Sequence, residues 1–388
     1  MITISSQLNL FYPSSESLKP LVKACDPATF GKNKEHVYDE FYRKAKKLSS
    51  NSFMVRLDLV GLGLIKIIRE NLLLGEASGR AVRAELYNLN VYGRSYTHPR
   101  IILLTSVLLG KGSFFKAHVD TPRGTKMFGS LVILFPTSFE GGNLIMRKGE
   151  KEWSFDAAKA LAECSGPHVA YVALYSDVEH EVSMVQSGHR ISVTYNLYFD
   201  DDAPSQAPTI PLSLSPHALE LKNILDILLL DATFFPDGGW LGFNLEHKYP
   251  VNGTFYNLKQ IKKNLKGTDA EVVRIAKELS LRTSIRAFVS ADYDLIAFDG
   301  YIPDLTDVCA ENIAHINGAV TLEEDMPVYW INKRTSELNR YEPEDVHGNE
   351  PDVEYQYKSF CLFIEVGKPG MRTTPPKPLG WRENTEED

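Results

Sequence analysis

Three side chains in the middle of the chain have the types and the spacing of a metal site. His118 and Asp120 form a His-x-Asp pair, and His180 lies further along in the run SDVEHEV. Such a pair is a weak signal alone, because 10 histidines and 50 acidic residues in 388 give about one chance match. On a strand, residues i and i+2 share a face, so His118 and Asp120 would converge on one point. A later histidine from a neighbouring strand would complete a two-histidine, one-carboxylate set, which suits ferrous iron and leaves coordination positions open.

A candidate anion-binding pair follows ten residues after His180. Arg190 and Ser192 share a strand face by the same period-2 rule, and the turn-forming pair Ser187-Gly188 precedes them. A guanidinium beside a hydroxyl can bind the distal carboxylate of a dicarboxylic acid through charge-assisted hydrogen bonds. A 2-oxo acid could then chelate iron at one end and be anchored by Arg190 at the other.

Short strand-like runs surround both groups of residues. From Glu85 onward they include ELYNLNVY, SLVILF, VAYVALYS and ISVTYNLYF, which are rich in β-branched and aromatic residues. Strands at this spacing, without long helices between them, predict an antiparallel sandwich or barrel. The segment EGGNL at 140–144 supplies glycines for a tight hairpin between two of the strands.

This strand-rich region resembles a known enzyme family. The runs SFFKAHVDTPRGTKMFGSLVILFPTSFEGGNLIMR and YVALYSDVEHEVSMVQSGHRISVTYNLY are similar to Fe(II)/2-oxoglutarate-dependent dioxygenases of the prolyl 4-hydroxylase type, above all to a fungal group of largely unassigned function. The resemblance is strong over 85–200 and weaker upstream from Phe30. Downstream it includes HGNEPDVEYQY at 347–357. It implies a double-stranded β-helix, a jelly roll whose two sheets hold the metal at one open end.

The same resemblance implies cofactors and site residues. The expected cofactors are Fe(II), 2-oxoglutarate and O2, with ascorbate as a further candidate, and the products are a hydroxylated substrate, succinate and CO2. The metal and the cosubstrate carry the chemistry, so no separate side-chain acid or base is expected. The residues implied are His118, Asp120 and His180 for iron, and Arg190, Ser192 and Tyr92 for 2-oxoglutarate.

The chain departs from the family pattern just before the first ligand. Family members usually have a tyrosine about nine residues before that histidine, whereas Tyr92 and His118 are 26 apart. Removing residues 94–110 restores a spacing of nine. We therefore interpret 94–110 as an insertion beside the metal site, either a genuine loop or a translated intron.

Charge and targeting signals bear on partners and location. The balance of 42 Lys+Arg against 50 Asp+Glu gives a net charge of −8, which argues against non-specific nucleic-acid binding. A nucleic-acid demethylase would add a second arginine six residues after Arg190, where the chain has Asn196. The start MITISSQLNLFYPSSES lacks the features of a signal peptide, and the apolar runs are too short to cross a bilayer. We expect a cytoplasmic or nuclear protein without nucleic-acid or membrane partners.

Helical patterns and linkers predict the domain order. Apolar residues recur at helical spacing in 34–49 and 59–74, which predicts a helical N-terminal segment packing on the core. A Pro/Ser-rich stretch after the strand-rich block is typical of a linker, and further helix- and strand-like runs follow it. The predicted α+β order is a helical segment at 1–84, the jelly roll at 85–200, a linker at 201–216, an α+β unit at 217–370 and a disordered tail at 371–388.

Two functions from different classes remain open on the sequence. The first is a dioxygenase that hydroxylates an unidentified substrate, a prolyl residue in a protein being the family-level expectation and a small metabolite a close alternative. The second is a non-catalytic jelly-roll binding or scaffold protein, with its site disrupted by 94–110 and with 217–370 serving as an interaction module.

Overall fold

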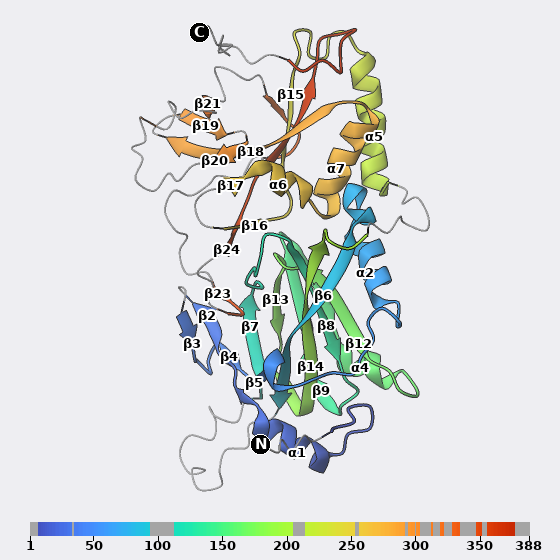
Figure 1. Cartoon of the computed structure of the whole chain (residues 1–388), viewed down its shortest axis with the longest axis vertical. Helices are drawn as coiled ribbons and strands as arrows, with labels where there is room; N and C mark the ends of the chain where they lie inside the picture. The colour runs from blue at the N-terminus through green and yellow to red at the C-terminus, as the bar shows by residue number, and fades with distance from the viewer. Residues whose placement is uncertain are drawn as a thin grey trace.

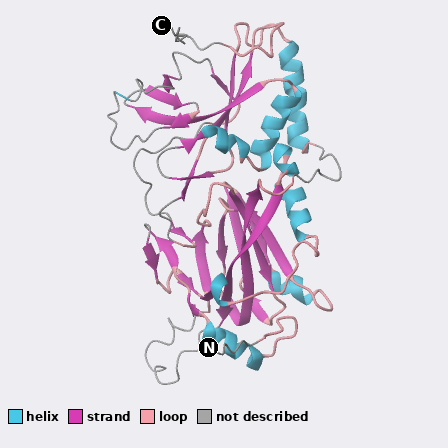
Figure 2. Cartoon of the chain, in the orientation of Figure 1, coloured by secondary structure: helices cyan, strands magenta, loops and turns pink. Residues whose placement is uncertain are grey.

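The chain folds into a mixed α+β structure that contains many strands and few helices (Figure 2). In the computed structural model the first half lies at one end of the molecule and the second half at the other (Figure 1). The insertion at 94–110 and most of the predicted tail lie outside the described residues. The structure describes residues 7–32, 35–93, 112–204, 214–252, 256–291, 294–298, 300–302, 312, 319–321, 328–333, 347–350 and 355–376.

The first half is built on a large antiparallel sheet, here called sheet A. Its strands lie in the order β1-β5-β6-β14-β8-β12, and β9 also pairs with β14. In the central pair, Arg190 of β14 lies opposite Tyr92 of β6. The strands of sheet A are β1 (Asp26–Pro27), β5 (Lys46–Ser49), β6 (Ala81–Gly93), β8 (Met127–Leu134), β9 (Phe139–Gly141), β12 (Ala170–Tyr175) and β14 (Val185–Asp200).

A smaller antiparallel sheet, here called sheet B, packs against sheet A. Its strands lie in the order β11-β10-β13-β7-β4. One buried apolar cluster contains Tyr92 and Leu134 from sheet A together with Phe115, Leu144 and Val182 from sheet B. The two sheets therefore share a core, as expected for an antiparallel sandwich. The strands of sheet B are β4 (Arg43–Lys44), β7 (Phe114–His118), β10 (Leu144–Lys148), β11 (Lys151–Phe155) and β13 (Glu179–Val182).

Helices cover the other face of sheet A. Leu18 and Ile68, from the first two helices, pack with Ile191 and Val193 of β14 in a second buried cluster. The side chains of β14 thus alternate between this cluster and the space between the sheets. The first helix begins with a capping box, in which the Ser14 and Ser17 side chains and backbone bond reciprocally. A further helix, α4 (Ala157–Ala162), instead contributes Ala157 and Leu161 to the cluster between the two sheets. The other helical elements of this half are α1 (Ser15–Ala24), η1 (Ser50–Ser52), α2 (Leu64–Leu72) and η2 (Gly75–Gly79).

The helix predicted over 34–49 is wrong, and within the predicted helical segment 1–84 these residues form strands. After β3 (Glu35–Val37), β4 pairs with β7 of sheet B and β5 pairs with β6 of sheet A. Both sheets offer unpaired backbone groups at those edges, and tertiary hydrogen bonding outweighs the local helical pattern. The strand conformation also buries Arg43, which is 4% exposed, between the sheets.

Two glycine segments differ from the expected turns. The EGGNL segment does not close a hairpin: β9 pairs with β14 in sheet A, and β10 pairs with β13 in sheet B. Gly141 and Gly142, with φ of 72° and 67°, carry the chain from one sheet to the other. Gly188 lies inside β14 with φ of 70°, and a Cβ there would come within 2.0 Å of the Ser138 carbonyl oxygen.

The second half contains the predicted mixture of helices and strands. Its main sheet, sheet C, has the order β21-β19-β18-β25-β15-β22, and α5 and α7 contribute Leu225 and Ile275 to its core. None of the helices described is both long and apolar enough to cross a membrane. The elements are α5 (Pro216–Leu230), β15 (Gly239–Asn244), β16 (Tyr249–Asn252), β17 (Tyr256–Asn257), α6 (Leu258–Lys263), α7 (Gly267–Glu278), β18 (Arg282–Ala291), β19 (Asp294–Phe298), β20 (Tyr301–Ile302), β21 (Ala319–Thr321), β22 (Val328–Trp330), β24 (Tyr355–Lys358) and β25 (Cys361–Val366).

The two halves meet through a buried group of charged side chains. Asp177, between β12 and β13, lies 2.7 Å from Lys266 Nζ and 3.2 Å from His247 Nδ1, and all three side chains are at most 3% exposed. Burial raises the pKa of Asp177, but Lys266 and His247 outweigh it and hold that pKa well below its ordinary value. A second contact is made by β23 (His347–Gly348), which pairs with β2 (Phe30–Lys32) of the first half.

Replacing Asp177 with asparagine should destabilise the protein by about 3 kcal/mol, because Lys266 would keep a buried charge without its counterion. Urea unfolding followed by circular dichroism measures the change. Asp237→Asn is the matched control, since Asp237 is 90% exposed in its pair with Lys368 and should cost less than about 0.5 kcal/mol. Equal effects of the two substitutions would contradict this account of the contact between the halves.

The same contact should depend on pH. Because the pKa of Asp177 is lowered in the folded state, its contribution to the free energy of unfolding should be lost as pH falls below about 4.

Candidate metal centre

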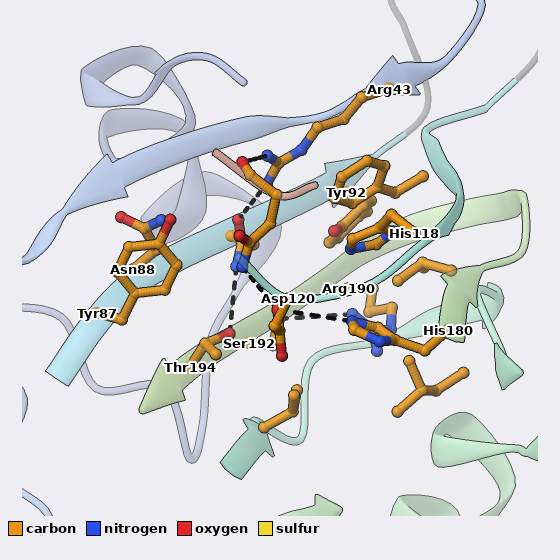
Figure 3. Close-up of a pocket in the computed structure, with 16 residues that line it drawn as sticks. Arg43, Tyr87, Asn88, Tyr92, His118, Asp120, His180, Arg190, Ser192 and Thr194 are labelled. Carbon is orange, nitrogen blue, oxygen red and sulfur yellow. Dashed lines mark hydrogen bonds and ion pairs between the residues drawn. The ribbon is translucent and has the colours of Figure 1, made fainter. Parts of the chain in front are cut away.

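Two histidines face each other across the β7–β13 ladder of sheet B. His118, at the end of β7, is the direct antiparallel partner of His180 on β13. Their ring centroids lie 4.4 Å apart, and both side chains point toward the centre of one pocket (Figure 3). The expectation that the second histidine comes from a neighbouring strand is therefore confirmed, and the pairing register brings the two rings together.

Backbone contacts orient both imidazole rings. His118 Nδ1 lies 2.8 Å from the carbonyl oxygen of Lys116, and His180 Nδ1 lies 3.0 Å from that of Val178. A carbonyl oxygen only accepts, so Nδ1 of each ring carries the proton and Nε2 keeps a lone pair for a metal. Phe115 stacks on His118 with ring centroids 3.5 Å apart and restricts the ring further.

Asp120 supplies the third candidate ligand. It follows β7 directly, and its Oδ1 lies 3.9 Å from His180 Nε2. Ser130 donates to Oδ2 at 2.5 Å, and Asn349 donates to Oδ1 at 2.6 Å. One ligand atom from each of the three residues lies within 4.8 Å of the others. This geometry fits a single ion bound by two imidazole nitrogens and one carboxylate oxygen.

The three side chains are removed from water. His118, Asp120 and His180 are 6%, 4% and 7% exposed. Burial, and then the proximity of His180, hold the pKa of His118 well below its ordinary value. His118 is therefore neutral at physiological pH, which is the protonation state that metal coordination requires.

Arg190 lies in the same pocket with a buried and largely unpartnered guanidinium. It is 1% exposed, and its Nε and Nη2 have no hydrogen-bond partner among the residues described. Its Nη1 lies 3.5 Å from Ser192 Oγ, and its guanidinium carbon lies 5.3 Å from the Tyr92 ring centroid. Burial lowers the pKa of Arg190 to about 10, so the side chain stays charged at neutral pH. A buried charge of this kind favours an anionic ligand.

All six residues predicted to bind iron or 2-oxoglutarate line one pocket. They are Tyr92, His118, Asp120, His180, Arg190 and Ser192.

Sequence reasoning missed several polar residues of this pocket. Arg43 on β4 donates to the Thr29 carbonyl at 2.6 Å and to Asn90 Oδ1 at 3.0 Å, and it lies over the Phe115 ring. No short motif identified Arg43, because its segment was expected to be helical. Asn349 belongs to the run HGNEPDVEYQY, which the resemblance includes, but the sequence alone predicts no role for it.

Comparisons with known proteins add a likeness to solved structures. No family model matches the chain, and no curated protein matches it. The structure is similar to a prolyl-4-hydroxylase from Pseudomonas putida, at 16% identity and a TM-score of 0.28, over 50% of this chain and 92% of that one. It is also similar to a prolyl hydroxylase from Trichoplax adhaerens, solved with a hypoxia-inducible-factor peptide, at 15% identity and a TM-score of 0.29, over 50% of this chain and 83% of that one.

A third similar structure is an oxidoreductase of the 2OG-Fe(II) oxygenase family from Burkholderia pseudomallei. It is 13% identical, with a TM-score of 0.24, over 50% of this chain and 81% of that one. At such identities and TM-scores the likeness decides neither the fold nor the activity of this chain. Both must rest on its own residues.

Mn²⁺, which binds oxygen and nitrogen ligands without being oxidised under anaerobic conditions, should bind the metal-free protein with a stoichiometry near one. Isothermal titration calorimetry measures it. His180→Ala should abolish this binding, because it removes one of three ligands. His217→Ala, a change at an exposed position of α5, should leave it unchanged. Full Mn²⁺ binding by His180→Ala would exclude the proposed ligand set.

Proposed function

We propose that the chain is an Fe(II)- and 2-oxoglutarate-dependent dioxygenase. One observation carries the proposal: a pocket combines a two-histidine, one-carboxylate cluster with a buried arginine whose guanidinium lacks an anionic partner among the described residues. The first feature fits an iron that keeps open coordination positions. The second fits the distal carboxylate of a 2-oxo dicarboxylic acid.

A hydrolytic zinc site uses similar ligands, and the pocket lining argues against it. Zinc hydrolases of the two-histidine, one-carboxylate type need a further carboxylate to take a proton from the metal-bound water. Among the described residues that line the pocket, Asp120 is the only acidic one. Its Oδ2 accepts from Ser130 and its Oδ1 lies 3.9 Å from His180 Nε2, so Asp120 is placed to serve as a metal ligand and not as that second carboxylate.

The cosubstrate would lie between the sheets, against sheet A. Arg190 would hold its distal carboxylate, with Ser192 beside it and Tyr92 opposite Arg190 in the β14–β6 pair. Gly142 makes room for this arginine, since a Cβ at that position would lie 2.9 Å from Arg190 Cδ. Binding of the distal carboxylate would also offset the cost of burying the charged Arg190 guanidinium, because the carboxylate would replace the water that the guanidinium loses on burial.

Fe(II) and 2-oxoglutarate together supply oxidative activation of O2, with succinate and CO2 as co-products. The chain itself contributes orientation and a dry environment. His118 and His180 present Nε2 lone pairs, while Ser130 fixes the Asp120 carboxylate. Apolar side chains line the same pocket and would limit the access of water to a bound ion. They include Phe115, Val132, Leu144 and Val182.

The architecture supports a double-stranded β-helix over 85–200. Sheets A and B face each other, with the metal ligands on sheet B and Arg190 on sheet A. A cosubstrate that spans from the ion to the arginine would therefore bridge the two sheets. We extend the proposal to the linker predicted at 201–216 and to the second unit predicted at 217–370.

For the primary substrate, a prolyl residue in a protein and a small metabolite are the two classes to test. The alternative, a binding protein without catalysis, would need a disrupted site. His118, Asp120, His180 and Arg190 all line one pocket, and this supports the enzyme over the binding protein. O2 is required in either substrate case, and ascorbate is a further candidate reductant.

Addition of Fe(II) and 2-oxoglutarate to the protein without O2 should give the weak visible charge-transfer band of the chelate.

Arg190→Ala should raise the 2-oxoglutarate concentration needed for half-maximal signal by about 100-fold, because a charged hydrogen-bonded pair is worth roughly 3 kcal/mol. Its affinity for Mn²⁺ should stay close to that of the original chain. Arg147→Ala is the control, since Arg147 is 32% exposed and pairs with glutamates on the surface. No band from folded protein, or equal loss of metal and 2-oxoglutarate binding in Arg190→Ala, would contradict the proposal.

A further inference from the structure

A short segment from the second half of the chain reaches the metal cluster. β23 pairs antiparallel with β2, and Gly348 forms a parallel bridge with Val119, between the two metal-ligating residues of the His-x-Asp pair. Asn349 and Glu350 follow directly. This places them beside Asp120, although 229 positions separate Asn349 from Asp120 in the sequence.

The Asn349 side chain is held by two hydrogen bonds that fix its orientation. Its Oδ1 accepts from the Thr121 backbone N–H at 2.9 Å, and its Nδ2 donates to Asp120 Oδ1 at 2.6 Å. A reversed amide would place its NH2 group against the Thr121 N–H and its oxygen against a carboxylate, so both contacts would become repulsive. Asn349 is 9% exposed, which leaves water little access to either bond.

The oxygen that Asn349 contacts is the one that faces the histidines. Oδ1 of Asp120 lies 3.9 Å from His180 Nε2, while Oδ2 accepts from Ser130. A carboxylate oxygen has two lone pairs, so Oδ1 can accept from Asn349 and still bind an ion. With both oxygens bonded, the carboxylate plane has one favoured orientation, which lowers the entropy lost when a metal binds.

We propose that Asn349 is a positioning residue for the metal-ligating carboxylate, so that the second half of the chain helps to complete the metal centre. This inference rests on the proposed metal site and adds a residue to it. In this role Asn349 acts on the ion through its hydrogen bond to Asp120.

Other contacts of the same segment secure it against the first half. Thr121 Oγ1 donates to the Glu350 carbonyl at 2.6 Å, and the Glu350 carboxylate lies 2.6 Å from Lys47 Nζ and 3.3 Å from His36 Nδ1. Burial raises the pKa of Glu350, but Lys47 outweighs it and lowers that pKa below its ordinary value. These contacts hold 347–350 against the first half through residues other than Asp120.

The test is Mn²⁺ binding to the metal-free full-length chain, measured by isothermal titration calorimetry in the absence of O2 and 2-oxoglutarate. Asn349→Ala should weaken Mn²⁺ binding about 10- to 100-fold, the usual effect of losing a partner of a metal ligand. Asn349→Leu keeps the side-chain volume and should do the same if the alanine variant folds poorly. Glu350→Gln is the matched control, because it weakens docking of the same segment without touching Asp120, and Mn²⁺ affinity should stay within about threefold.

The outcomes separate this inference from the proposed function. Unchanged Mn²⁺ affinity in folded Asn349→Ala and Asn349→Leu would overturn the positioning role while leaving the metal site intact. An equal loss in Glu350→Gln and in the Asn349 variants would also overturn it, since docking alone would then explain the effect. Failure of the unaltered chain to bind Mn²⁺ would instead refute the metal site on which the inference depends.

Discussion

The pairing register between β7 and β13 is the constraint on which the rest of the site depends. It sets His118 directly opposite His180 and leaves Asp120 at the point where β7 ends. A slip of one residue would turn one imidazole to the other face of sheet B, and the ligand atoms could no longer meet. The ladder contains a bulge between His180 and Val182, next to this pair. Within each strand, a carbonyl contact to Nδ1 orients the imidazole ring.

The second requirement is a charge that the fold leaves without an anion. Arg190 is almost fully buried in sheet A, across the pocket from the candidate ligands, and the described residues leave its Nε and Nη2 unpaired. An arginine whose role was structural would be expected to contact a carboxylate, as Arg147 does at the surface of sheet B. An anionic ligand in the pocket would offset the free-energy cost of burying the Arg190 charge. The segment around Asn349 adds a third element, because it links the ligand carboxylate to the distant half of the chain.

Part of the central pocket could be predicted from the sequence because period-2 geometry is local. Residues i and i+2 on a strand share a face, so His118 with Asp120, and Arg190 with Ser192, could be placed together from spacing alone. Two features depended on contacts that no local pattern encodes. Arg43 lies in a segment whose apolar pattern is helical. The segment forms strands instead, because its backbone pairs with the edge of each sheet. The run HGNEPDVEYQY around Asn349 stands out in the sequence, but the contact of Asn349 with Asp120 arises only from the tertiary fold.

An anaerobic crystal structure with Mn²⁺ and 2-oxoglutarate would test the central claim most directly. Anomalous scattering should place one ion between Nε2 of His118, Nε2 of His180 and a carboxylate oxygen of Asp120. The 2-oxo acid should chelate that ion and extend its distal carboxylate to the Arg190 guanidinium. An ion bound elsewhere, or a 2-oxoglutarate molecule that contacts neither the ion nor Arg190, would contradict the account.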